Sequence, residues 1–144
     1  MRRKAREYAL QVLYALDVNA FPVEEFLTMF WELHTTKPQI IEYASRLVKG
    51  TLKRKKEIDA FISTHASHWK INRMAVTDRN ILRLATYELL GEPSVPFKVV
   101  MNEAIEIAKK FGTTDSATFI NGVLDSIHQE LQQSSTEAQQ AGKS

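Results

Sequence analysis

The first residues of the chain combine positive charge with a later aromatic ring, a combination that can bind single-stranded RNA. The charges are those of Arg2, Arg3, Lys4 and Arg6. On a helical wheel of 100° per residue, Arg3 and Tyr14 share the face opposite the apolar stripe with Glu7 and Leu10. Cations can neutralise phosphates and an exposed ring can stack on a base, so this segment is a candidate RNA surface. The alternative is a charged helix end that contacts only solvent.

A second basic cluster lies near the middle of the chain. It consists of Lys49, Lys53, Arg54, Lys55 and Lys56. No aromatic residue is interleaved with these charges, and the opposite face of the segment is apolar. The formal net charge is only +2, so an argument for a nucleic-acid partner depends on where charges lie rather than on their sum. We interpret this second cluster as a solvated helix face.

Two carboxylates fall near an apolar arc in the second half of the sequence. Asp78 and Glu88 lie within one predicted helix, close to the arc of its leucine and isoleucine residues. A carboxylate in an apolar arc must be paired or must reach the rim, because burying an unpaired charge is costly. The two interpretations are an intramolecular partner or cap, and a rim contact to a protein partner.

Sequence signatures of catalysis are missing. The chain has no glycine-rich phosphate loop, no nucleophile elbow and no His-Glu-x-x-His zinc pair. It also has no cysteine, which removes thiol nucleophiles and cysteine-ligated metals. We therefore expect a protein that is not an enzyme and that needs neither a cofactor nor a metal.

The elements that must position these residues are helices. With 144 residues the chain has room for one domain, and five glycines, four prolines and little alternating apolar patterning predict an all-α fold. The apolar spacing predicts helices over 3–17, 23–33, 38–65 with a cap or kink at Gly50, 77–90, 97–111 and from about 116 to 131. After Leu131 the apolar periodicity stops. We expect a domain over 1–131 and a disordered polar tail over 132–144.

Targeting signals are also missing from the sequence. The basic start is followed by Glu7, Gln11 and Asp17 rather than by an unbroken apolar run, so no signal peptide is predicted. No apolar stretch approaches the roughly 20 residues of a membrane span. Together with the absence of cysteine, this composition favours a soluble protein in a reducing cytoplasm.

Four segments together resemble the NusB family of transcription antitermination factors. They are residues 3–14 (RKAREYALQVLY), 78–89 (DRNILRLATYEL), 95–112 (VPFKVVMNEAIEIAKKFG) and 119–125 (FINGVLD). The blocks occur in the order and at about the spacing of the family, and they span residues 3–125. The resemblance implies about seven helices in two small subdomains. It also implies pairing with the ribosomal protein NusE, binding of the pair to boxA RNA in ribosomal-RNA leader transcripts, and action within an RNA polymerase antitermination complex.

The resemblance further implies which residues form the binding surfaces. The RNA surface maps onto Arg2, Arg3, Lys4, Arg6, Gln11, Tyr14, Asp115, Thr118 and Phe119, and the protein-partner surface onto Asp78, Tyr87 and Glu88. Many relatives carry Lys or Arg at the position of Thr118, so the affinity for RNA is expected to depend more on the first helix. The alternative function is a helical protein–protein interaction domain that binds little RNA by itself. A homodimer that covers the RNA surface remains open.

Overall fold

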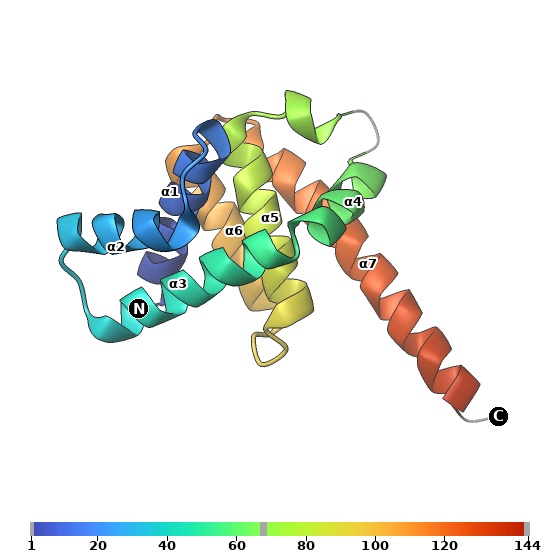
Figure 1. Cartoon of the computed structure of the whole chain (residues 1–144). Coiled ribbons are helices and arrows are strands. Elements are labelled where there is room, and N and C mark those ends of the chain that lie inside the picture. The colour runs from blue at the N-terminus through green and yellow to red at the C-terminus, as the bar shows by residue number, and fades with distance from the viewer. Residues whose placement is uncertain (1, 67–68, 143–144) are drawn as a thin grey trace.

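The computed structural model describes residues 2–66 and 69–142, with all side chains in these ranges except those of 137–141. This part of the chain contains no strand, which confirms the predicted all-α class. Its elements are α1 (Arg2–Val18), α2 (Val23–Leu33), α3 (Pro38–Lys53), α4 (Lys55–His65), a short 3-10 helix η1 (Ile71–Arg73), α5 (Val76–Gly91), α6 (Phe97–Phe111) and α7 (Ser116–Gly142) (Figure 1). None of these helices combines the length and the apolar composition that a membrane span requires.

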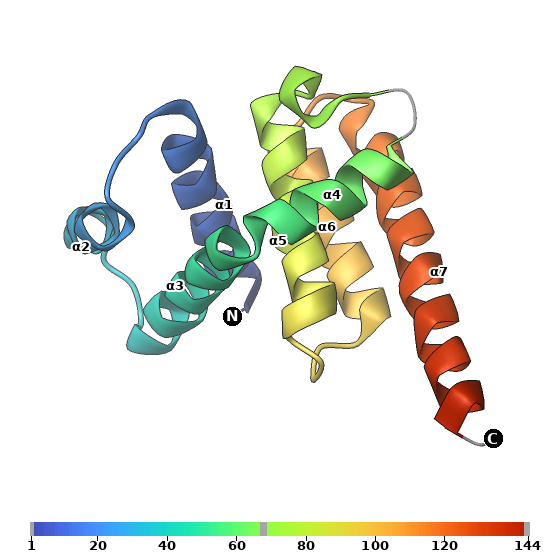
Figure 2. The same ribbon diagram turned by 45° about the vertical axis from the view of Figure 1, so that its right-hand side comes forward.

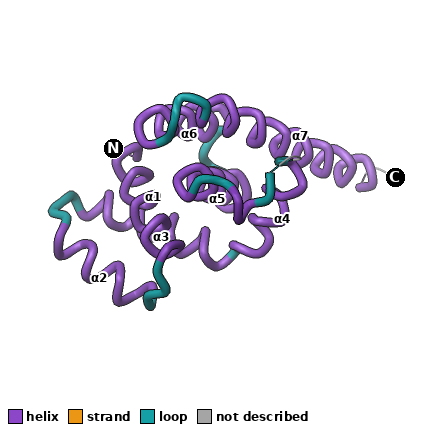
Figure 3. Tube along the Cα trace, turned by 90° about the horizontal axis from the view of Figure 1, so that it is seen from above, coloured by secondary structure: helices purple, strands orange, loops and turns teal. Residues whose placement is uncertain are grey.

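Helix α5 is the centre of the fold. Viewed from above, it is surrounded by α1, α3, α4, α6 and α7, and it contacts all five (Figure 3). Helices α1–α3 form one group and α4–α7 the other (Figure 2). The two groups share one apolar core because α1 and α3 also pack on α5. Every residue of α5 from Asn80 to Glu88 is buried, so its sequence has no single solvent face.

Helix α1 is buried on more sides than its wheel predicts. The apolar stripe of Ala5, Ala9 and Val12 is buried as expected, but Glu7 and Leu10 on the opposite face are also only 5% and 3% exposed. The prediction of a solvent-facing surface along α1 is therefore wrong for this middle part. The physical reason is that α1 is packed between α3 and α5 while a side chain from α6 covers Glu7. A wheel shows which residues share a face, but not how many neighbours the helix has.

The expected break at Gly50 lies four residues later. Helix α3 runs through Gly50 to Lys53, and α4 begins at Lys55. The ring of Tyr87 from α5 lies against both Gly50 and Gly91, in the space that a Cβ atom at either position would need. Gly50 is therefore required for close helix packing rather than for a cap.

The last helix extends beyond the expected boundary at Leu131. Helix α7 continues to Gly142, and its C-terminal part projects away from the other helices (Figures 1 and 2). Leu131 still packs against the core, whereas residues 132–136 are exposed. The change of composition after Leu131 thus marks the end of core packing and not the end of the helix. That this segment is mobile in solution stays a prediction.

Removing residues 132–144 is expected to change the free energy of unfolding by no more than about 0.5 kcal/mol, because the segment buries no described core residue. A protruding helical segment without a partner is marginal in water. The matched control is truncation after Ser126, which also removes the fully buried Ile127 and should cost about 2 kcal/mol or more. Urea unfolding followed by circular dichroism measures both. Equal losses from the two truncations would contradict the placement of the core boundary.

Candidate nucleic-acid interface

The first turn of α1 presents three basic side chains to solvent. Arg2, Arg3 and Lys4 are all exposed. The Arg2 guanidinium lies 4.8 Å from the centre of the Tyr43 ring on α3, and Lys4 Nζ lies 4.8 Å from the centre of the Tyr8 ring. These cation–π contacts orient the side chains without neutralising their charge. Two positive charges at the start of α1 are thus available to an anionic ligand.

Arg3 points in another direction, toward α6. Its Nε and Nη2 atoms donate to the two carboxylate oxygens of Glu103, at 2.8 and 3.0 Å. The hydrogen bond from Arg3 and its charge lower the pKa of Glu103. The Arg3 side chain is 56% exposed, whereas that of Glu103 is 17% exposed, so the arginine is the solvent-accessible member of the pair. Arg3 is therefore accessible to a ligand, but its charge is already paired with that of Glu103.

Arg6 is not part of the exposed basic cluster, which corrects the sequence prediction. Its side chain is 4% exposed, and Nε and Nη2 donate to Glu88 of α5 at 2.7 and 2.9 Å. The hydroxyl of Tyr43 donates to the same carboxylate at 3.4 Å. The turn from Arg3 to Arg6 rotates the side chain toward α5, so Arg6 links α1 to the central helix and cannot reach a phosphate.

Gln11 and Tyr14 lie farther along α1. Tyr14 is 43% exposed, as its proposed stacking role requires, and Gln11 is half-buried. Tyr14 lies twelve residues after Arg2, which corresponds to about 18 Å along a helix. The basic and aromatic parts of the predicted surface on α1 therefore do not form one compact patch.

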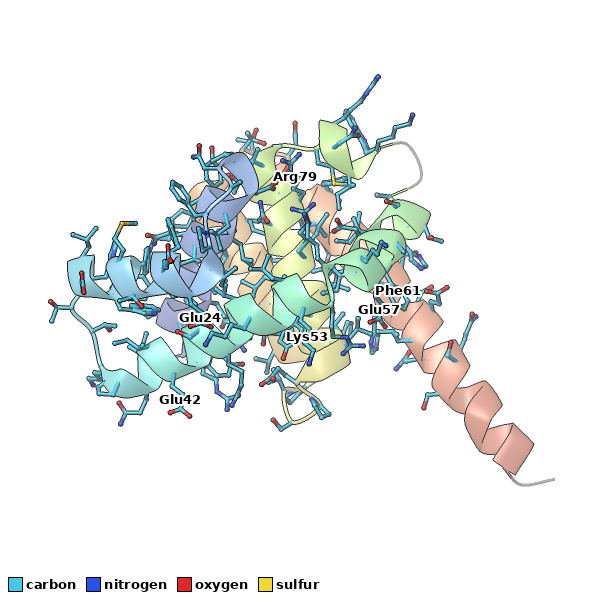
Figure 4. All side chains as sticks on the ribbon, viewed as in Figure 1. Glu24, Glu42, Lys53, Glu57, Phe61 and Arg79 are labelled. Carbon is cyan, nitrogen blue, oxygen red and sulfur yellow. The ribbon has the colours of Figure 1, made fainter. Side chains whose placement is uncertain are left out.

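Polar contacts bring the end of α1 together with the starts of α5 and α7. Asp17 accepts hydrogen bonds from Arg79 Nε at 2.7 Å, Asn80 Nδ2 at 2.8 Å and Arg83 Nη1 at 3.0 Å. Figure 4 labels Arg79 at the start of α5. Next to it, Asp78 accepts a hydrogen bond from the hydroxyl of Ser116 at 2.7 Å, which attaches the first residue of α7. This network places the Tyr14 end of α1 and the beginning of α7 at the same end of the molecule.

The hydrogen bonds to Asp17 make the stability of the fold depend on pH in the acidic range. Burial alone would raise the pKa of Asp17, but hydrogen bonds from Arg79 and Asn80 and the charges of Arg83 and Arg79 outweigh it and lower the pKa from 3.8 to about 2. A lowered pKa stabilises the fold above about pH 4, and this contribution is lost as the pH falls toward 2. It amounts to about 2 kcal/mol.

Asp17→Asn should therefore be about 2 kcal/mol less stable than the wild type at pH 6, with the difference disappearing near pH 2. Urea unfolding at a series of pH values measures this. Asp125→Asn, an exposed carboxylate on α7, is the control and should show no comparable dependence. A stability difference that stays constant across the series would contradict the assignment to the charge of Asp17.

The start of α7 supplies the remaining predicted RNA residues. Asp115 and Thr118 are exposed, and Phe119 is half-buried. The Phe119 ring meets Trp69 edge to face, with 6.5 Å between ring centres. Trp69 is 56% exposed. The sequence prediction did not identify Trp69 and the exposed Arg73 as site residues; the available signal was an aromatic and a cation close together in the connection before residue 76.

Residues of α6 also border α1 and were not predicted as site residues. Lys110 Nζ donates to both oxygens of the buried Glu7, at 2.6 and 3.1 Å, while its own side chain stays 60% exposed. Lys110 also lies 5.3 Å from the centre of the Phe111 ring, which is 38% exposed. The C-terminal end of α6 thus adds an exposed cation, which is paired with Glu7 of α1, and an exposed aromatic ring.

The second basic cluster is partly neutralised. Lys49 pairs with Glu24 at 2.9 Å, and Arg54 pairs with Glu57 at 3.0 Å. Lys53 and Glu57 lie on the two sides of the α3–α4 junction (Figure 4). These pairs favour the interpretation of this cluster as a solvated face.

The predicted protein-partner residues are mostly buried. Glu88 is 2% exposed and bound to Arg6, and Tyr87 is 8% exposed and donates to Glu92 at 3.2 Å. The expectation that Glu88 reaches a rim is wrong; its intramolecular alternative is correct. Asp78 is half-buried, and it is the member of this set that retains access to solvent. In the described part of the chain no three His, Asp or Glu side chains are grouped as metal ligands.

Comparisons with known proteins match most of the chain. A model described as the NusB family matches residues 3–129. The transcription antitermination protein NusB of Desulfatibacillum aliphaticivorans is 44% identical over 130 residues, which cover 90% of this chain and 91% of that protein.

Solved NusB structures also match most of the chain. NusB of T. maritima superposes with a TM-score of 0.82 at 39% identity, covering 90% of this chain and 92% of that one. A crystal structure of the antitermination factors NusB and NusE in complex with double-stranded RNA contains a chain with a TM-score of 0.81 and 30% identity. The match covers 90% of this chain and 96% of that one.

Proposed function

Because the chain belongs to the NusB family, we propose that it is a transcription antitermination factor that works as an RNA-binding adaptor. Its partner is a NusE-type ribosomal protein, since a similar chain is seen with NusE and RNA. The RNA is a single-stranded boxA-like element of ribosomal-RNA leader transcripts. The pair acts in the cytoplasm as part of an RNA polymerase complex that resists termination.

The observation that carries this proposal is that the exposed side chains of α1 and of the start of α7 include both cations and aromatic rings. The cations belong to the first turn of α1, with Arg2 and Lys4, and the rings are those of Tyr14 and the half-buried Phe119. Charges fix the phosphate backbone and carry no sequence information, whereas rings and capping polar groups contact bases. Tyr14, Asp115 and Phe119 are therefore the residues that discriminate boxA from other RNA. Thr118 adds a hydroxyl but no charge.

The second candidate function is a helical protein-interaction domain with little RNA binding of its own. Exposed apolar side chains on α2 favour it, with Leu33 73% exposed and Met29 46% exposed. Such side chains suit a protein interface, including one between two copies of this chain, better than they suit RNA.

Titration of boxA-like and scrambled RNA, each with and without the NusE-type protein, tests the proposal. The expected result is tighter binding of the boxA-like RNA, with a further gain when the partner is present. If the chain binds the partner but neither RNA, alone or in the pair, the interaction-domain function replaces the proposed one.

A further inference from the structure

A hollow of about 400 Å³ lies between η1, the start of α5 and the start of α7. These three segments meet at the top of the molecule in Figure 1. Its lining combines aromatic rings, carboxylates and a guanidinium. They belong to Trp69, Phe119, Asp78, Asp115 and Arg73.

The two rings form an apolar wall. Their planes are inclined at 75°, so the edge of one ring meets the face of the other. Trp69 keeps 56% of its surface exposed, which is unusual for a residue of this size without a partner. A planar aromatic ligand can stack on such a surface, and every nucleobase has a face for stacking.

The carboxylates determine which polar groups a ligand in the hollow can present to them. Asp78 accepts a hydrogen bond from Ser116 at Oδ1, and none of the described residues donates one to its Oδ2. Asp115 also lines the hollow and is exposed. Ionised carboxylates only accept hydrogen bonds, and they repel phosphates. The part of an occupant that meets these carboxylates should therefore carry hydrogen-bond donors rather than a phosphate.

One cation lines the hollow and a second is close to it in the chain. Arg73 is part of the lining, and Lys70 lies just before η1; both are exposed. A base inside the hollow and its phosphate at the rim would thus each meet the complementary charge. This arrangement distinguishes a nucleotide of an RNA strand from a free aromatic molecule.

We propose that the hollow binds one unstacked nucleobase of the RNA, with guanine preferred and uracil disfavoured. This inference rests on the RNA binding proposed above and specifies which base it selects at one position. Guanine presents two adjacent donors, N1–H and the N2 amino group, which match a carboxylate. Uracil presents carbonyl oxygens on both sides of its single N–H, and these would face the carboxylates. A good two-point contact discriminates between bases by about tenfold or more.

The test uses Trp69 as its own reporter. The chain has two tryptophans, so Trp31→Phe leaves Trp69 as the single fluorophore and serves as the reference protein for every variant. The probes are an all-uridine heptamer and the same heptamer with one central guanosine. We expect the guanosine heptamer to bind about tenfold more tightly and to change the Trp69 emission more strongly than the all-uridine heptamer does.

Two variants separate the roles of the lining residues. Asp78→Asn should remove most of the guanosine preference, because an amide no longer offers two equivalent acceptors, while its oxygen can still accept from Ser116. Asp125→Asn, on the exposed side of α7, is the control and should leave the preference unchanged. Arg73→Ala should weaken binding of both heptamers by a similar factor, since a phosphate contact does not depend on the base.

The possible outcomes distinguish failure of the base pocket from failure of the proposed RNA binding. Equal affinities for the two heptamers, or a guanosine preference that survives Asp78→Asn, would overturn the base pocket and leave RNA binding intact. If neither heptamer nor a boxA-like RNA binds, with or without the NusE-type partner, the proposed function fails and the base pocket fails with it.

Discussion

Arg6→Ala is expected to lower the free energy of unfolding by about 3–5 kcal/mol, because it leaves the Glu88 carboxylate buried without its partner. A domain of this size is stable by about 5–15 kcal/mol, so the loss is a large fraction of the total. Arg3→Ala is the matched control. It removes an arginine from the same helix that also pairs with a glutamate, but this guanidinium is exposed to solvent, so the loss of stability should be much smaller.

Urea unfolding followed by circular dichroism measures both variants. The double variant Arg6→Met with Glu88→Leu should recover most of the stability, because it removes both charges and fills the space with apolar groups. If that double variant folds and binds RNA as the wild type does, Arg6 makes no contact with RNA. Similar losses from Arg6→Ala and Arg3→Ala would show that the Arg6–Glu88 pair is not buried as described.

Helix α1 should contribute three basic residues, rather than four, to the salt dependence of RNA binding. Each phosphate contact to a single strand contributes about −0.7 to the slope of log affinity against log salt concentration. Arg2, Arg3 and Lys4 therefore contribute about −2 to the slope, whereas including Arg6 predicts a contribution of about −3. Replacing the three exposed residues with alanine should make the slope shallower by about 2 and cause the largest loss of affinity at low salt.

Tyr14→Ala should behave differently from the charge variants. Loss of a stacking partner costs about 1–3 kcal/mol of binding free energy and leaves the slope nearly unchanged. The control replaces Lys53, Lys55 and Lys56 with alanine, which removes the same charge from the α3–α4 junction and should leave the slope unchanged. Titrations over a salt series measure these effects. RNA binding that persists undiminished without Arg2, Arg3 and Lys4 would contradict the assigned surface.

The sequence determined the helical class and most of the helix positions. Apolar residues recur with the period of a helix, and Pro22, Pro38 and Pro96 lie beside helix starts, so local chemistry alone specifies the segments. It also determined that positive charge is concentrated at the beginning of α1 and that Tyr14 is exposed. These features depend on neighbours in the sequence, which a helical wheel describes well.

Only the tertiary structure decided which charged residues reach solvent. Arg3 and Arg6 are one turn apart, yet one lies on the surface and the other is paired with Glu88 from a helix 82 residues away. Glu88 and Tyr87 have the residue types of a binding surface and are buried instead. The reason is that α1 and α5 are covered by neighbouring helices on several sides. The apolar periodicity of a sequence carries no information about how many helices pack around it.

The hollow beside Trp69 is the clearest case of a feature that the tertiary structure created. Its residues come from the connection 69–75 that contains η1, from the start of α5 and from residues 113–119 around the start of α7, and the hydrogen bond from Ser116 to Asp78 helps to hold two of these segments together. Each residue alone has an ordinary sequence environment. The sequence determines which side chains each segment carries. Only packing around α5 brings the rings, the carboxylates and the cation to one place, because distances between segments depend on long-range contacts.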